Sequence, residues 1–238
     1  MAFLSLETTV GQAVAEKPGL ARVFEKLGID YCCGGKIPLS QACRDKGLDG
    51  ATVLQVLAAY EGGKGSDDHG NWALTTVSQL IDHILVDHHA YLRIEMPRLE
   101  IMIGKVVAAH GQREPHLAEV QSVYQGLRAE LEQHMMKEEQ ILFPLMRELE
   151  TARTRPVSHC GSVENPIRVM IMEHEHAGDA LGRLRQLTKD YTAPPEACNT
   201  YRALLDGLRE MEGDLHRHIH EENNILFPKA VKMEAALA

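Results

Sequence analysis

HMMKEEQILFP, residues 134–144, carries the pattern that decides the fold. His134 and Glu138 lie four residues apart, so they share one face of a helix. The same design returns as HIHEENNILFP at residues 218–228, with an offset of 84 (218 − 134 = 84). A single tetrapeptide such as ILFP could recur by chance, but together with a matching His-x-x-x-Glu it indicates an internal repeat.

Four long segments with helical periodicity follow a glycine-rich stretch, EGGKGSDDHGN. We expect residues 1–60 to form a small helical domain with a Cys-Cys motif, 61–73 a linker, and 74–238 a four-helix bundle. The predicted bundle helices lie near 76–109, 116–149, 165–190 and 197–233. Their short connections favour an all-α, up-down-up-down arrangement. In the small domain we predict helices between Pro18 and Gly28, over 39–46 and over 51–60.

The inward stripe of each long helix is apolar except near one level. In the second helix this stripe runs through Leu127, Leu131, Ile141 and Leu145. At the exceptional level the four helices contribute four histidines and two glutamates: His89, His134, Glu138, His174, His218 and Glu222. A buried ionised carboxylate costs several kcal/mol unless it is paired or bound to a metal. One histidine on an apolar face is more often a hydrogen-bonded core residue, but six such residues on four helices predict a metal site.

The ligand count limits the kind of metal. Two bridging carboxylates and four imidazoles are too few for two octahedral ions and too many for one tetrahedral zinc. Two iron or manganese ions that share Glu138 and Glu222 fit best, and the imidazoles favour iron. Positions left open would take O₂, NO, peroxide or water, because the apolar stripes leave little room for a larger ligand.

Other residues near the bundle carry weaker signals. Glu130 and Glu173 lie beside the ligand level and would act as hydrogen-bond partners or proton relays, or be ordinary half-exposed glutamates. We expect seven further histidines on the surface, with His88 and His176 as the expected exceptions: His83, His88, His110, His116, His176, His216 and His220.

Cys32 and Cys33 lie on a predicted turn before two glycines. Adjacent cysteines are poorly placed to bind one metal ion together, and a disulfide between them is strained. They could react as thiols with NO or in redox exchange, or simply pack in the small domain.

The composition excludes several classes of partner. The 238-residue chain has a formal net charge of −9, which gives no electrostatic footprint for nucleic acid or for an anionic membrane surface. No stretch approaches the ~20 apolar residues of a membrane span, and the first residues lack the basic region of a secretory signal. Five cysteines fit a reducing cytoplasm better than a disulfide framework. A homodimer is left open.

DYCCGGK at 30–36, HMMKEEQILFP and ENNILFP at 222–228 together resemble the repair of iron centres family of hemerythrin-like di-iron proteins. The resemblance covers nearly the whole chain. It implies that the four histidines and two glutamates above hold two non-haem iron ions joined by an oxo bridge. The sequence departs mildly from the family pattern at His88 and His220, which add imidazoles close to the implied ligands.

The same resemblance implies a role in stress. The protein would repair iron–sulfur clusters after nitrosative or oxidative damage, through NO binding or reduction or through iron donation to damaged iron–sulfur proteins. The alternative is a cytoplasmic NO or O₂ scavenger or sensor that transfers no iron, and enzymatic turnover of NO is left open. A thiol-bearing domain favours repair, since a gas carrier needs none. A ferritin-like oxidase would use more than two carboxylates.

Overall fold

The computed structural model describes residues 4–61 and 72–237, and their regular structure is helical. Among these residues the one pairing of extended backbone is an isolated bridge between Thr9 and Pro38. The all-α prediction is therefore confirmed. In the same described ranges, no helix combines the length and the apolar character that crossing a bilayer requires.

The small N-terminal domain has an apolar core of its own, which includes Phe24 and Leu57. Its elements are α1 (Val10–Glu16), the 3₁₀ turn η1 (Pro18–Leu20), α2 (Ala21–Leu27), α3 (Leu39–Asp45) and α4 (Gly50–Glu61). Pro18 opens η1, and Gly28 closes α2 with a left-handed φ of 65°, as the sequence predicted. α1 was not predicted from the sequence, although Thr9 starts it with a capping box.

The expected linker at 61–73 lies mostly outside the described residues. At its far end the chain continues in the 3₁₀ turn η2 (Trp72–Leu74).

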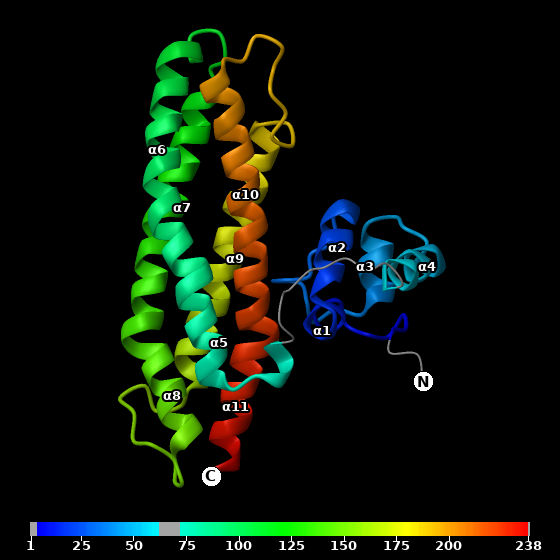
Figure 1. Cartoon of the computed structure of the whole chain (residues 1–238), viewed down its shortest axis with the longest axis vertical. Helices are drawn as coiled ribbons and strands as arrows, with labels where there is room; N and C mark the ends of the chain where they lie inside the picture. Colours follow the sequence, from blue (N-terminus) through cyan, green and yellow to red (C-terminus); the bar gives the residue numbers. More distant parts are fainter. Residues whose placement is uncertain (1–3, 62–71, 238) are drawn as a thin grey trace.

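The rest of the chain forms four long antiparallel helical rods (Figure 1). The first rod comprises α5 (Val77–His83), η3 (Ile84–His89) and α6 (Ala90–His110); the second α7 (Leu117–Lys137), η4 (Glu138–Leu142) and α8 (Phe143–Thr151). The third is α9 (Glu164–Leu187), and the fourth comprises α10 (Asn199–Glu221), η5 (Glu222–Leu226) and α11 (Phe227–Ala236). Connections 111–116 and 188–198 lie at one end and 152–163 at the other (Figure 1). The predicted up-down-up-down bundle is therefore present.

Three of the four rods contain a π-helical turn at the level of the candidate ligands, namely η3, η4 and η5. In η4 the Phe143 N–H bonds the Glu138 carbonyl, five residues back, and η5 repeats this from Phe227 to Glu222. A proline follows each phenylalanine and has no N–H to continue the α-helical ladder, so a wider turn before it fits the sequence.

The π turn also corrects one sequence prediction. Ile141 was expected on the inward stripe, but its side chain is 39% exposed. The extra residue in the turn advances the register, and Leu142 is buried in its place at 1% exposure.

The candidate ligands divide the bundle core into two apolar clusters. One cluster includes Leu92, Met135 and Leu215, and the other includes Ile84, Leu142 and Leu226. The polar layer between them is therefore enclosed by apolar packing on both sides, which removes water and lowers the local dielectric.

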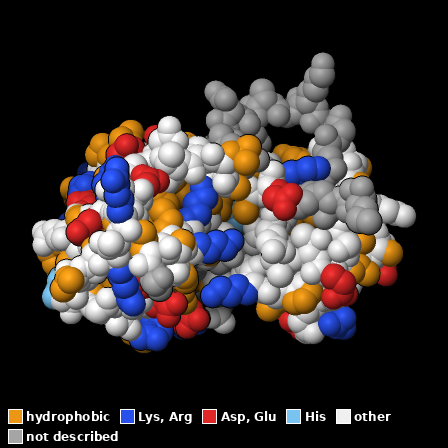
Figure 2. Space-filling model, turned by 90° about the horizontal axis from the view of Figure 1, so that it is seen from below, with side chains coloured by type: hydrophobic (Ala, Val, Ile, Leu, Met, Phe, Trp, Pro, Cys, Tyr) orange, Lys and Arg blue, Asp and Glu red, His pale blue; other side chains and the backbone are white. Residues whose placement is uncertain are grey.

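The N-terminal domain forms a second lobe against the side of the bundle (Figures 1 and 2). The Asn224 side-chain amide donates to the carbonyl of Cys32 at 3.1 Å, and His220 Nδ1 donates to the carbonyl of Tyr31 at 3.2 Å. The approach is close, since a Cβ on Gly35 would lie 2.5 Å from Asn224 Oδ1. The domain is thus held to α10 and η5, next to a candidate ligand.

Candidate metal centre

All six residues selected from the sequence meet inside the bundle and are buried. They form two overlapping groups: His89, Glu138, His218 and Glu222 in one, and His134, Glu138, His174 and Glu222 in the other. Within each group the potential ligand atoms lie within 4.8 Å of one another. Both glutamates belong to both groups.

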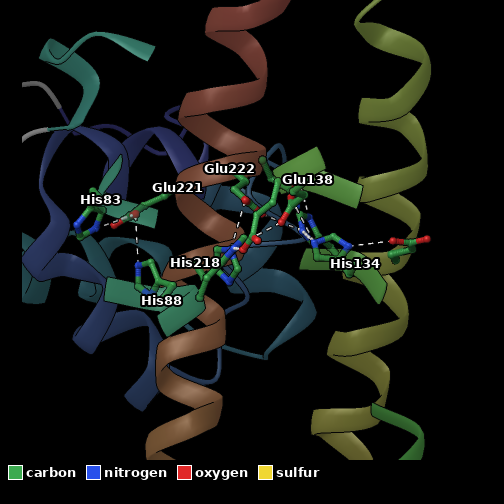
Figure 3. A network of polar contacts seen from close by, with 12 residues as sticks. His83, His88, His134, Glu138, His218, Glu221 and Glu222 are labelled. Carbon is green, nitrogen blue, oxygen red and sulfur yellow. Dashed lines mark hydrogen bonds and ion pairs between the residues drawn. The ribbon is translucent and has the colours of Figure 1, made fainter. Parts of the chain in front are cut away.

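The two carboxylates each face both groups with different oxygens. Glu138 Oε2 lies 3.3 Å from His89 Nε2, and Glu138 Oε1 lies 3.4 Å from His134 Nε2. Glu222 repeats this, with Oε1 at 3.3 Å from His218 Nε2 and Oε2 at 3.1 Å from His174 Nε2. This is the arrangement that two bridging carboxylates need between neighbouring ions (Figure 3).

Hydrogen bonds on the far side of three imidazoles fix which nitrogen faces the centre. Their Nδ1 atoms contact Glu139 (2.7 Å, from His89), Glu173 (2.9 Å, from His134) and the Asn223 amide oxygen (2.9 Å, from His174). All three partners are acceptors, so Nδ1 carries the hydrogen and Nε2 of the neutral ring offers a lone pair inward.

The inward-facing atoms of the six residues lie close together. His134 Nε2 and His174 Nε2 lie only 3.1 Å apart. His89 Nε2, both nitrogens of His218 and all four oxygens of the two glutamates are buried without a hydrogen-bond partner among the described residues. Only a positive charge, either a proton or a metal ion, makes such a set of acceptors stable.

The pKa values of the site reflect the competition between burial and neighbouring charges. Burial disfavours a charged imidazole, but the Glu138 carboxylate outweighs burial and raises the pKa of His134 to about 10. Burial and the Glu222 charge oppose ionisation of Glu138, yet His134 holds the pKa of this carboxyl below its usual range. Burial, with the neighbouring His89 and His88, lowers the pKa of His218 well below its usual value. The glutamates are therefore ionised, and they attract cations.

Comparison with known proteins identifies the fold and its relatives. The hemerythrin HHE cation binding domain matches residues 80–230, and a domain of unknown function (DUF542) matches residues 6–61. A probable iron-sulfur cluster repair protein of Haemophilus influenzae is 36% identical over 214 residues, 90% of this chain and 92% of the relative. Iron-sulfur cluster repair proteins YtfE of Citrobacter koseri and Escherichia coli O157:H7 are each 35% identical over 225 residues, 94% of this chain and 97% of theirs. The chain belongs to the hemerythrin-like iron–sulfur cluster repair family. The family's domain and the His/Glu groups together make this centre a cation-binding site.

In this member of the family a small cavity of about 10 Å³ adjoins the centre, next to His134, His174 and His218. Its other walls are mostly apolar and include Leu131 and Ile219. A space of this size holds about one water molecule. It can therefore bring a diatomic ligand or a water to the histidines, and nothing much larger.

The two glutamates predicted beside the ligands have different places. Glu173 accepts from His134 Nδ1 and also pairs with Lys137, so it orients a candidate ligand. Glu130 is exposed at the wall of the small cavity, and within the described part of the chain it makes no hydrogen bond to a candidate ligand.

The two adjacent cysteines lie where the N-terminal domain meets the bundle. The Cys33 thiol donates to the backbone carbonyl of His174 at 3.6 Å. The Asp30 carboxylate accepts from the backbone N–H groups of both cysteines and from the Cys32 thiol. Contact with Cys33 and burial raise the pKa of the Cys32 thiol well above its usual value. Cys32 is thus a protonated thiol, and Cys33 is the one placed against the centre.

Several of the other histidines do not lie on the surface as predicted. His220 is 4% exposed because the N-terminal domain covers it, and His83 is half-buried against Trp72. His88, an expected exception, is buried, whereas His176, the other expected exception, is exposed. His110, His116 and His216 are half-buried. His220 is buried because the N-terminal domain packs against it. Helix periodicity cannot predict such a contact with a domain far away in the sequence.

Proposed function

We propose that this protein holds two iron ions between Glu138 and Glu222 and uses them to repair iron–sulfur clusters damaged by nitrosative or oxidative stress. The observation that carries the proposal is the convergence of imidazole and carboxylate lone pairs, with each carboxylate divided between two groups of ligands. The names of the relatives, which are iron-sulfur cluster repair proteins, support the role in repair.

The donor set favours iron over other metals. Each group supplies two imidazole nitrogens and two carboxylate oxygens, which is four protein ligands for one ion. Octahedral ions such as iron or manganese then keep open positions, whereas zinc in a four-ligand site is closed. The imidazoles, which suit iron, outnumber the carboxylates.

The residues around the ions define what can react there. When bound, the two irons would supply binding of a small ligand and one-electron redox chemistry. Glu139, Glu173 and Asn223 hold three imidazoles in orientation, and the apolar walls of the cavity exclude bulk water and large ligands. NO and O₂ fit this space, and damaged iron–sulfur proteins are the proposed recipients of iron.

The compartment follows from the cysteines. All five are free thiols, and two of them lie against each other in the N-terminal domain. Free thiols persist in a reducing environment, so we propose that the protein acts in the cytoplasm.

A scavenger or sensor of NO or O₂ that transfers no iron is the second candidate, and the small apolar cavity favours it. Both functions use the same metal ligands. They differ in whether iron leaves the protein for a damaged cluster.

The deciding experiment follows iron and activity together. Iron-loaded protein is added anaerobically to a cluster enzyme that NO has inactivated, and recovery of activity and transfer of iron are measured. His174→Ala should abolish recovery, whereas His176→Ala, an exposed histidine on the same helix, should not. Stoichiometric NO binding without any recovery would rule out repair in favour of scavenging.

A further inference from the structure

A third group of potential metal ligands lies outside the dinuclear centre. It consists of His83 at the end of α5, His88 in η3 and Glu221 at the end of α10 (Figure 3). Their ligand atoms lie within 4.8 Å of one another. None of the three belongs to the six residues described above.

Both imidazoles of this group are oriented as they are in the dinuclear centre. His83 Nδ1 lies 2.5 Å from Asp87 Oδ2, and His88 Nδ1 lies 3.0 Å from Asp214 Oδ1. The Nε2 atoms consequently face Glu221 Oε2, at 3.1 Å from His83 and 3.4 Å from His88. A carboxylate behind each histidine fixes the ring and raises its basicity as a ligand.

Buried atoms without partners point into this group. His88 Nε2 and Glu221 Oε2 make no hydrogen bond to any described residue, although His88 is 4% exposed and Glu221 8%. Bonds of roughly 2.0–2.1 Å to a tetrahedral ion place its ligand atoms about 3.3–3.4 Å apart, close to the separations seen here. The two separations from Glu221 Oε2 therefore suit ligands of one ion.

The surrounding charges favour a cation. Asp87, Asp214 and Glu221 contribute three carboxylates, and Arg217 contacts only one of them, Asp214, at 3.4 Å.

We propose that His83, His88 and Glu221 bind one divalent first-row transition-metal ion. Three protein ligands leave the fourth position of a tetrahedral ion open. Trp72 stacks on His83 with ring centres 4.0 Å apart, and a cavity of about 30 Å³ next to Glu221 separates the bundle from α1 and η1. That cavity has room for about two water molecules, and water there lies next to Glu221.

The site adjoins the dinuclear centre directly. The His88 ring lies parallel to the ring of His218, with centres 5.2 Å apart and 4° between the planes. Such a position suits an ion in transit between the centre and the N-terminal domain. That role rests on the proposed iron donation, whereas binding of the ion does not.

Metal stoichiometry tests the site. The full-length protein, stripped with a chelator and kept anaerobic, is titrated with Co²⁺, and bound metal is measured by absorption and by elemental analysis. We expect about three ions per chain for the wild type and about two for His83→Ala and for Glu221→Gln, since each variant removes one of three ligands. His176→Ala, which removes an exposed histidine, should keep all three. Circular dichroism shows whether each variant is folded.

The outcomes separate this site from the dinuclear one. A wild type that binds two ions, with no change in His83→Ala, would overturn the third site, and so would a third ion that survives both variants. One ion per chain, lost in His83→Ala but kept in His174→Ala, would support the third site and refute the dinuclear centre instead.

Discussion

Raising the pH should strengthen metal binding at the proposed dinuclear centre. The pKa of His134 is raised to about 10, so between the ordinary histidine pKa of 6.5 and this value the apoprotein holds a proton on the nitrogen that faces the centre. A metal ion must displace this proton. The raised pKa also means that the proton stabilises the folded apoprotein fully below pH 6.5, and that this contribution is lost as the pH rises toward 10.

The size of the effect follows from one displaced proton. Affinity then rises about tenfold for each pH unit, so from pH 6.5 to 8.5 it gains about 100-fold, or about 2.7 kcal/mol at about 1.36 kcal/mol per unit. For a domain of 150–250 residues, about 2–4 °C per kcal/mol makes the metal-induced rise in Tm about 5–11 °C larger at pH 8.5 than at pH 6.5.

Two measurements check this prediction. Calorimetry of Co²⁺ binding in buffers with different ionisation enthalpies counts the protons released, and thermal unfolding with buffered Co²⁺ gives the change in Tm. Measurements with His83→Ala isolate the dinuclear centre from the third site. If affinity is the same at both pH values and no proton is released, His134 is neutral in the apoprotein and the electrostatic reasoning is wrong.

Three other substitutions, with two control variants, test neighbouring contacts. Glu173→Gln should weaken metal binding about 10–100-fold in a chelator competition, because it loosens a ligand, while Glu130→Gln should leave affinity unchanged. Asn224→Ala leaves the Cys32 carbonyl without its side-chain donor and the Tyr31 carbonyl with His220 alone, so we expect a loss of about 1–3 kcal/mol and faster hydrogen exchange in the N-terminal domain at unchanged metal content. Gly35→Ala should be more damaging, since its Cβ would lie 2.5 Å from Asn224 Oδ1 and 2.7 Å from a backbone oxygen. Gly126→Ala, in the interior of α7 with nothing within 4 Å, should instead raise the free energy of unfolding by about 1 kcal/mol.

The six candidate ligands were predictable because polar residues are rare at buried stripe positions. Their presence there therefore indicates a function. A glutamate at a stripe position is expensive unless a cation compensates it, and the repeat showed that His134 with Glu138 had a counterpart in His218 with Glu222. Helix periodicity then sufficed to bring these residues together, and the structure places them as the stripe required.

Periodicity failed where the helices leave regular geometry. An α-helical register put Ile141 inward, but η4 inserts a residue and buries Leu142 instead. Pro144, three residues after Ile141, is a signal for this, because it lacks an N–H and the helix must adjust before it. The burial of His220 was not predictable, since residues nearly 190 positions away in the sequence cover it (220 − 31 = 189).

Adjacent residue pairs explain how one bundle could hold both kinds of site. Neighbours in a helix point about 100° apart, so His88 and His89, or Glu221 and Glu222, cannot serve the same ion from a regular helix. Here His89 and Glu222 face the other candidate ligands of the centre, while His88 and Glu221 face each other and His83. Glu221 also lines the cavity beside the docked domain. The first and fourth rods therefore contribute ligands in two directions. A substitution at either inner residue should affect the dinuclear centre, and its outer neighbour should affect the third site.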